Sequence, residues 1–260
     1  MMRAAASFAV FALTLTSVFF GSATSARADD AEPARLVMFV GVDISGSFLK
    51  RKAFDDSLRF LSVYLHAHLN GYGGLERPHS LFVGPLGGQN ADEAKTFFPI
   101  ETFRGESIEG IHNELVKMFP KTKVNPFTDY NAFILQIASY VKSRKLILKP
   151  ISIVMISDGA PDLPKVKGDK AFKQIELKPL ELLSRNVTLR LLYTNAVRGE
   201  NWQTKVKRAR VRIWTQDDIV MKQWSDPKIY KEGKPAAEQE AFFDWLKNNV
   251  DFIPPPRAVN

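Results

Sequence analysis

The sequence of 260 residues contains no cysteine. This absence excludes disulfide bonds, thiolate metal ligands, cysteine nucleophiles and a lipid-modified cysteine at an export cleavage site. Histidine is scarce as well, with four residues. His66 and His68 are two apart on a predicted helix, so they point to different sides and cannot chelate one ion together. No Ser/His/Asp arrangement follows from the spacing of the remaining residues. If the protein has a metal site, its ligands are therefore expected to be carboxylates and hydroxyls.

Long apolar runs are missing outside the first 28 residues. Residues 1–3 form a short basic start, residues 4–20 are apolar or small, and Ala26-Arg27-Ala28 offers an Ala-x-Ala cleavage site. This is the pattern of a secretory signal peptide. An uncleaved membrane anchor is the alternative, but the run is shorter than the roughly 20 apolar residues that span a bilayer. We expect cleavage near Ala28, a periplasmic product (or, as the alternative, a secreted one) and no membrane span in the mature chain.

The formal charge is +8, and it falls to +6 if Arg3 and Arg27 are removed with the signal peptide (34 basic against 28 acidic residues). A basic surface can bind nucleic acid or anionic lipid. Here the basic residues are scattered, and their clusters lack the interleaved aromatic side chains that stack on bases. We therefore expect a solvated surface and no nucleic-acid partner.

The hydrophobic pattern alternates between strands and helices. The continuous apolar run at 36–42 indicates a strand that is buried on both faces; another buried strand is expected at 151–156, and the next strand at 187–193. Between and around them, apolar residues at helical spacing predict helices. Such alternation predicts an α/β, Rossmann-like, doubly wound and mostly parallel sheet, flanked by helices and carrying one antiparallel edge strand. The other expected strands are at 79–83, 96–103 and 210–214; the expected helices are at 54–65, 108–118, 130–141, 180–185 and 202–208, with a last one around 242–246.

The stretch from Val40 to Phe48 combines a strand end with polar chemistry. After the apolar run, Asp43-x-Ser45-x-Ser47 presents one carboxylate and two hydroxyls from a tight turn. Hard cations such as Mg²⁺ take oxygen ligands of this kind, often with only one or two carboxylates. A second acid, Asp158, follows the apolar strand 151–156. Because ligands in such sheets bind at the carboxyl ends of strands, we expect Asp43 and Asp158 to lie close together.

Three segments together resemble the von Willebrand factor type A (VWA) family. Asp43-x-Ser45-x-Ser47 looks like its first signature, Thr128-x-x-x-Ala132 like its second, and Ser157-Asp158-Gly159 like its third. The spacings also fit, with 81 residues from Ser47 to Thr128 and 30 from Thr128 to Asp158. The resemblance covers roughly residues 34–214. It implies a domain organisation with a signal peptide at 1–28, a VWA-like domain at 29–214, and a C-terminal helical extension at 215–260 that packs on the domain and ends in a Pro-rich tail.

The resemblance also implies a function, through a metal-ion-dependent adhesion site (MIDAS). Ser45 and Ser47 would bind Mg²⁺ through their hydroxyls, and Thr128 would bind it directly or through water, depending on whether a ligand is present; Mn²⁺ or Ca²⁺ are alternatives. Asp43 and Asp158 would hold the ion directly or through water. Sites of this family leave one coordination position open for an acidic side chain of a partner protein. The implied molecule is an exported, metal-dependent protein-binding module without enzymatic activity.

A Mg²⁺-dependent phosphohydrolase is the alternative function. Its nucleophile would be the strand-end carboxylate of Asp43, with Asp217 and Asp218 as metal ligands. That chemistry usually requires a second acid two residues after the nucleophile, and Ser45 stands in this place.

Overall fold

The chain divides into two units, Met1–Glu32 and Pro33–Asn260, and the fold described here is that of the second. A computed structural model describes residues 34–87, 96–122, 124, 126, 128–162, 166 and 168–252. The expected signal peptide and the Pro-rich tail lie outside these residues. Among the described residues, none of the helices has both the length and the apolar character that crossing a membrane requires.

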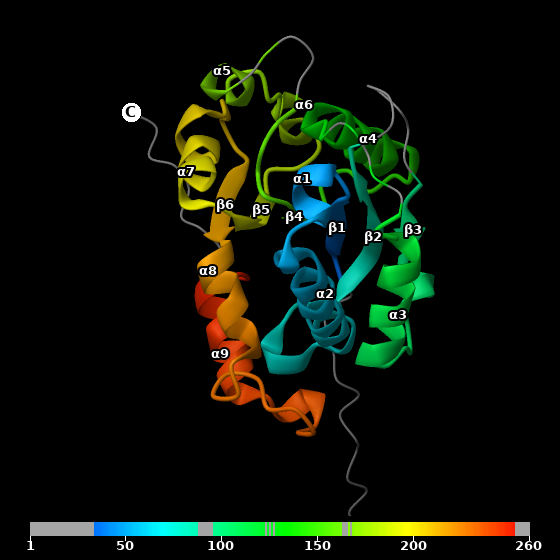
Figure 1. The fold of residues 1–260 in the computed structure, drawn as a ribbon. Helices are drawn as coiled ribbons and strands as arrows, with labels where there is room; N and C mark the ends of the chain where they lie inside the picture. Colours follow the sequence, from blue (N-terminus) through cyan, green and yellow to red (C-terminus); the bar gives the residue numbers. More distant parts are fainter. Residues whose placement is uncertain are drawn as a thin grey trace, which may run out of the picture. The chain divides into compact units, whose positions relative to one another are not determined.

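Six strands form one sheet in the order β3-β2-β1-β4-β5-β6 (Figure 1). All neighbouring pairs are parallel except β2 and β3, so β3 is an antiparallel edge strand. This arrangement confirms the fold class predicted from the sequence. The strands are β1 Leu36–Asp43, β2 Pro78–Leu86, β3 Phe98–Pro99, β4 Ile151–Ile156, β5 Val187–Thr194 and β6 Arg212–Asp217.

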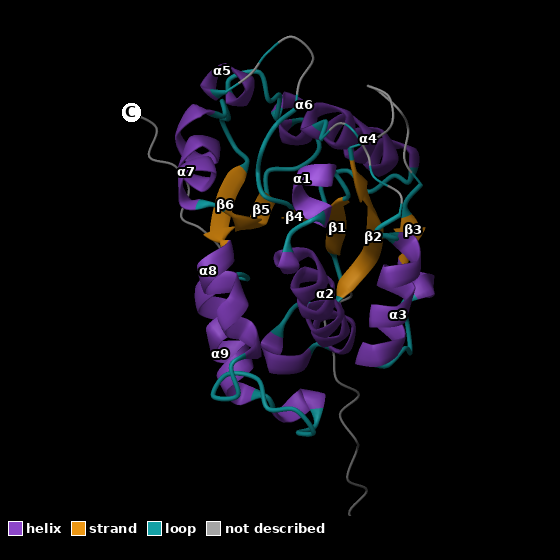
Figure 2. Ribbon diagram, viewed as in Figure 1, coloured by secondary structure: helices purple, strands orange, loops and turns teal. Residues whose placement is uncertain are grey.

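Helices cover both faces of the sheet, and each face has its own hydrophobic core (Figure 2). In β1, Met38 and Val40 belong to one core while Val37 and Phe39 belong to the other, as the alternation of side chains along a strand requires. The first core is completed by α1 Gly46–Leu49, α2 Lys52–Asn70, α3 Ile108–Met118, α8 Asp218–Met221 and α9 Glu240–Asn249. The second is completed by α4 Tyr130–Ser143, α5 Asp169–Phe172, α6 Lys178–Glu181 and α7 Ala196–Lys205.

Short 3-10 helices lie in the described connections, at η1 Tyr72–Gly74, η2 Ile100–Thr102, η3 Lys222–Ser225 and η4 Ala236–Glu238. A side chain would be unfavourable at Gly71 because of its backbone conformation, and at Gly41 because of its close packing. Helix α2 ends at Gly71, whose φ of 70° is the left-handed conformation that favours glycine. Gly41 lets β1 approach α4, because a Cβ at this position would lie 2.6 Å from the Phe133 ring. The close packing of Gly41 and Phe133 places α4, which follows Thr128, directly against β1.

Several predicted boundaries were wrong. The strand expected at 96–103 pairs only over Phe98–Pro99, because proline has no N–H to donate to the sheet and the chain continues as η2. The helix expected at 202–208 begins at Ala196, where Asn195 caps it. The helix expected at 180–185 spans Lys178–Glu181, and residues 84–86, expected in a loop, belong to β2. The last strand, expected at 210–214, continues to Asp217, so the expected domain boundary at 214 falls inside β6.

The site is placed by the order of the strands. The chain leaves β1 for β2 on one side and returns for β4 on the other side of β1. Open α/β sheets bind ligands where the direction of the connections reverses, outside the carboxyl ends of the strands. In this chain that point lies between β1 and β4.

Candidate metal centre at the carboxyl edge of the sheet

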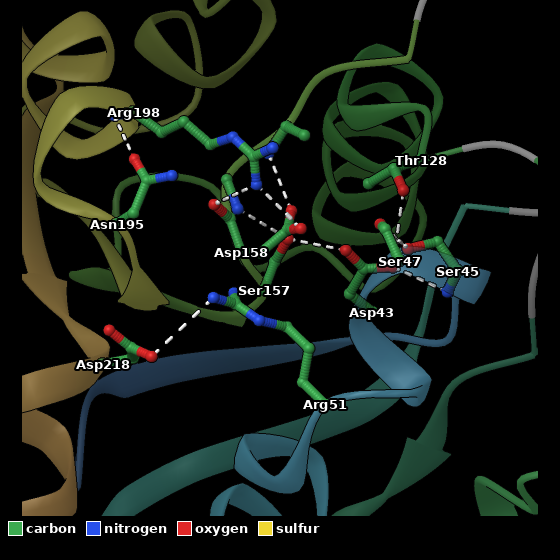
Figure 3. Close-up of polar contacts among 12 residues, drawn as sticks. Asp43, Ser45, Ser47, Arg51, Thr128, Ser157, Asp158, Asn195, Arg198 and Asp218 are labelled. Atoms are coloured by element: carbon green, nitrogen blue, oxygen red, sulfur yellow. Dashed lines mark hydrogen bonds and ion pairs between the residues drawn. The ribbon is translucent and has the colours of Figure 1, made fainter.

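Three segments that are far apart in the sequence meet at the carboxyl ends of β1 and β4 (Figure 3). The end of β1 supplies Asp43, the N-cap of α1 is Ser45, and the second residue of α1 is Ser47. The residue two before α4 is Thr128, and the residue two after β4 is Asp158. The structure therefore brings together all five residues that the sequence singled out.

Local hydrogen bonds hold the second segment in place. Asp129 caps α4, with its Oδ1 accepting from the backbone N–H of Ala132 at 3.0 Å. The backbone N–H of Asp162 donates to the carbonyl oxygen of Thr128 at 3.2 Å. The first bond fixes Thr128 at the mouth of the helix, and the second ties it to the loop that follows Asp158.

Asp43 is the centre of the site, with no exposed surface. Its Oδ1 accepts from the backbone N–H of Ser45 at 2.8 Å and from Thr128 Oγ1 at 3.4 Å. Its Oδ2 accepts from Ser157 Oγ at 2.7 Å. Burial raises the pKa of Asp43 above its usual value, the hydrogen bonds from Ser157 and Ser45 oppose this rise, and the nearby charge of Asp158 adds to it. Neutral donors therefore compensate the carboxylate only in part.

Ser157 connects Asp43 to Tyr130, the first residue of α4. The hydroxyl of Ser157 lies 2.7 Å from the hydroxyl of Tyr130, and it also accepts from the backbone N–H of Gly159 at 3.1 Å. Because the single hydroxyl hydrogen of Ser157 points to Asp43, Tyr130 must be the donor in their contact. Burial, together with the negative charge of Asp43, raises the pKa of Tyr130 well above its usual value, so the phenol keeps its proton.

Asp158 has a cationic partner that the sequence analysis missed. Its Oδ2 lies 2.8 Å from Nη1 of Arg198, and its Oδ1 accepts from the backbone N–H of Ala160 at 3.0 Å. Arg198 is in the first turn of α7, whose cap Asn195 accepts from the backbone N–H of Arg198 at 2.8 Å. An Asn that follows an apolar strand is a helix-start signal. If Asn195 had been recognised as a helix cap, the predicted helix would have placed Arg198 at the same edge of the sheet as Asp158.

The hydroxyl groups fit a hard cation. Ser45 Oγ and Ser47 Oγ lie 3.1 Å apart. Two ligands at neighbouring corners of a Mg²⁺ octahedron are about 3.0 Å apart, because each bond is about 2.1 Å long. Ser45 is buried whereas Ser47 is exposed, so the hydroxyl pair opens toward solvent on one side. Among the described residues, no group of three or more His, Asp and Glu side chains could hold a metal ion, so hydroxyls are needed to complete a ligand set.

The acids of the alternative enzyme are engaged elsewhere. Asp217 caps α8, with its Oδ1 accepting from the backbone N–H groups of Ile219 and Val220, both at 2.9 Å. Asp218 pairs with Lys222 at 3.2 Å and with Arg51 at 3.7 Å. The hydrogen-bond donors to the Asp43 carboxylate are Ser45, Thr128 and Ser157, so neither of these acids shares its network.

No protein-family model and no curated protein matches the sequence. Solved structures do match it. Proximal thread matrix protein 1 (PTMP1) from the mussel byssus, solved with a zinc-occupied MIDAS motif, has 12% sequence identity and a TM-score of 0.45, over 75% of this chain and 46% of that chain. The SpRpn10 VWA domain has 11% identity and a TM-score of 0.41, over 70% of this chain and 87% of that chain. Manganese-loaded TRAP from Plasmodium vivax has 13% identity and a TM-score of 0.38, over 70% and 69%.

This chain spans less than half the length of PTMP1. At these identities the likeness concerns the fold alone. The sheet itself carries the structural conclusion, since its strand order and its antiparallel edge are seen directly. With helices on both faces of this sheet and the three signature segments at its carboxyl edge, the chain has a VWA-like fold.

Proposed function

We propose that this chain is an exported binding protein without enzymatic activity, which holds a divalent cation and uses it to engage an acidic side chain of a partner protein. The observation that carries the proposal is the convergence of oxygen atoms from three distant segments around the buried carboxylate of Asp43. The residues proposed to hold the cation are Asp43, Ser45, Ser47, Thr128 and Asp158.

The two kinds of oxygen have different roles. The hydroxyls of Ser45, Ser47 and Thr128 would bind the cation, while Asp43 and Asp158 would balance its charge. A bound cation would supply an electrophilic position that accepts a carboxylate from outside, since hydroxyls are neutral ligands. The exposed side of Ser47 gives such a carboxylate access. Mg²⁺ is the proposed ion because it keeps several waters and needs few carboxylates; Mn²⁺ and Ca²⁺ are alternatives, and Ca²⁺ would require more oxygen ligands.

Binding calorimetry with Mg²⁺ and Mn²⁺ tests the metal site. We expect one ion per chain in the wild-type protein and no measurable binding after Asp43→Asn. Asp244→Asn is the matched control, because Asp244 is exposed on α9 and should leave binding unchanged. An Asp43→Asn protein that is folded and binds the ion as tightly as the wild type would show that the site is elsewhere.

The partner can be sought with the same variants. Immobilised wild-type protein should retain a partner from a periplasmic extract in Mg²⁺ and release it on addition of EDTA. The Asp43→Asn variant should not retain it. Retention that is insensitive to both EDTA and Asp43→Asn would contradict a metal-dependent contact.

The phosphohydrolase alternative receives less support. A nucleophilic carboxylate must reach its substrate, yet Asp43 is fully buried and both of its oxygens accept hydrogen bonds. Asp217 and Asp218 are engaged in a helix cap and in ion pairs. Mg²⁺-dependent release of phosphate from an aryl phosphate, lost in Asp43→Asn, would overturn the proposal of a non-enzymatic function.

Export and cleavage near Ala28 are proposed from the sequence pattern of residues 1–28. Amino-terminal sequencing of the protein from a periplasmic fraction should find Asp29 as the first residue. Recovery of the protein in the cytoplasm with residues 1–28 intact would contradict export.

A further inference from the structure

Arg198 holds Asp158 at two points. Its Nη1 lies 2.8 Å from the carboxylate Oδ2 and 3.3 Å from the backbone carbonyl oxygen of the same residue. The carboxylate is 4% exposed and the arginine side chain is 35% exposed. The guanidinium therefore covers the outer side of a buried acid that is proposed to balance the charge of a metal ion (Figure 3).

The position of Arg198 is fixed by the packing of α7 on the segment after β4. Trp202, one turn further along α7, donates from Nε1 to the carbonyl oxygen of Gly159 at 3.0 Å and has no exposed surface. Gly159 has a φ of 80°, and a Cβ at this position would lie 3.5 Å from the Cβ of Arg198. With the Asn195 cap, these contacts direct the arginine toward Asp158 rather than into solvent.

The charges at the site explain what the arginine does there. Asp43 and Asp158 are both buried and repel each other. Two buried carboxylates without a cation are costly, since a buried charge needs a partner of opposite sign. Arg198 supplies one positive charge. A divalent cation bound at the same acids would supply two.

A guanidinium and a dication cannot share this carboxylate without cost. The two positive charges would repel each other, and the Asp158 oxygens already accept from Arg198 and Ala160. Binding of a cation at Asp158 therefore requires that the contact with Arg198 be weakened or given up.

We propose that Arg198 is a built-in counter-ion of the site, which neutralises Asp158 in the absence of a divalent cation and competes with that cation for the carboxylate. This inference rests on the proposed function. Arg198 makes the metal-free protein stable and sets its affinity for the cation low. The protein would then be loaded only where the divalent cation is plentiful or where a partner carboxylate adds to the binding energy.

Metal titration of an Arg198 variant tests this directly, for example with Mn²⁺ followed by electron paramagnetic resonance. Arg198→Met keeps most of the side-chain length and removes the charge. We expect its dissociation constant for Mn²⁺ to be about 10- to 100-fold lower than that of the wild type, the range by which a charge-assisted bond to a carboxylate can shift an equilibrium. In EDTA the variant should melt at a lower temperature than the wild type, and saturating Mn²⁺ should remove most of that difference.

Arg51→Met is the matched control. Arg51 also lies beside the site (Figure 3), but its guanidinium pairs with Asp218 at 3.7 Å instead of with a proposed ligand. Its removal deletes a positive charge from the same region without freeing Asp158. We expect less than about a threefold change in the dissociation constant, because Arg51 pairs with Asp218 and its partly exposed charge acts on the ion only from a distance, where salt screens it. Arg198→Gln, which keeps a hydrogen-bond donor without the charge, replaces the Met variant if that variant does not fold.

The outcomes separate this inference from the proposed function. If the wild type binds Mn²⁺ and the Arg198 variants bind it equally or more weakly, the competition is refuted and the metal site stands. If an Arg198 variant binds Mn²⁺ and the wild type does not, the competition is supported and the metal dependence of the natural chain is refuted. If none of the proteins binds Mn²⁺ at millimolar concentration, both are refuted. If Arg51→Met lowered the dissociation constant for Mn²⁺ as much as Arg198→Met, the effect would come from the general loss of positive charge. That result would refute a specific role of Arg198.

Discussion

Replacement of Ser157 by Ala tests how the buried charge of Asp43 is held. The Ser157 hydroxyl donates to Asp43 Oδ2 at 2.7 Å, and it accepts from Tyr130, 2.7 Å away. None of the three side chains is more than 1% exposed. The substitution therefore removes a bond to a charged group and also leaves the Tyr130 hydroxyl without its acceptor.

The magnitude follows from these two losses. A hydrogen bond to a charged group contributes about 1.5–3 kcal/mol, and a buried donor left unpaired costs about 1–3 kcal/mol. We expect Ser157→Ala to lower the free energy of unfolding by about 3–4 kcal/mol. Tyr130→Phe removes a donor without leaving one unpaired, so its expected cost is about 1 kcal/mol. In the double variant no orphaned tyrosine hydroxyl remains, and the expected loss is about 1 kcal/mol smaller than the sum of the single losses.

Urea denaturation in EDTA measures these free energies without a contribution from metal ions. Ser143→Ala is the control, because the Ser143 hydroxyl is exposed and donates only to the Tyr140 carbonyl oxygen, at 3.0 Å. Its expected loss is below about 0.5 kcal/mol. A loss below about 1 kcal/mol for Ser157→Ala would refute the reasoning about the buried charge. Strict additivity in the double variant would refute the contact between Tyr130 and Ser157.

Three further predictions concern the stability of the fold, and urea denaturation can check each. Arg190→Met should cost about 3–5 kcal/mol, because the guanidinium is 4% exposed and lies 3.5 Å from Asp251; a loss below about 1 kcal/mol would contradict this. Burial alone would raise the pKa of Asp251, but hydrogen bonding and charge from His68, with the charge of Arg190, lower it below 3.8. The stability that Asp251 contributes is thus present above pH 3.8 and lost as the pH falls through the lowered value, so Asp251→Asn should flatten the acid side of the stability profile; an unchanged profile would count against it. Gly41→Ala should lower the free energy of unfolding by about 1–3 kcal/mol, because its Cβ would lie 2.6 Å from the Phe133 ring. Adding Phe133→Leu should recover part of that loss. If Gly41→Ala leaves the stability unchanged, the Phe133 ring moves freely and the reasoning is wrong.

The sequence predicted the central strands because their burial leaves a direct trace. Strands β1 and β4 are buried along their whole length, so both consist almost entirely of apolar residues, and a polar segment with an acid follows each run. Parallel strands then bring Asp43 and Asp158 to the same edge without further information. Thr128 was identified through the resemblance of Thr128-x-x-x-Ala132 to the second VWA signature, and the structure places it two residues before α4.

Other features depend on packing that the sequence does not record. Arg198 pairs with Asp158 only because α7 begins six residues earlier than its apolar residues suggested, at a cap that was not recognised. Arg190 lies in the middle of the apolar strand β5, and nothing in the local pattern indicates that its guanidinium is buried against the end of α9, where it donates to the Val250 carbonyl oxygen at 2.8 Å. The edge strand β3 was overestimated because apolar residues followed Pro99, although they enter η2 and the core instead.

The most direct test of the metal site is the location of the ion itself. Crystals soaked in MnCl₂ and measured at the manganese absorption edge should give one strong anomalous peak at the carboxyl edge of the sheet. We expect that peak within coordination distance of the hydroxyl oxygens of Ser45, Ser47 and Thr128, with Asp43 and Asp158 beside it. A strong peak elsewhere on the molecule would contradict the proposed metal centre. So would the absence of a peak both in crystals of the wild type and in crystals of the folded Arg198→Met variant.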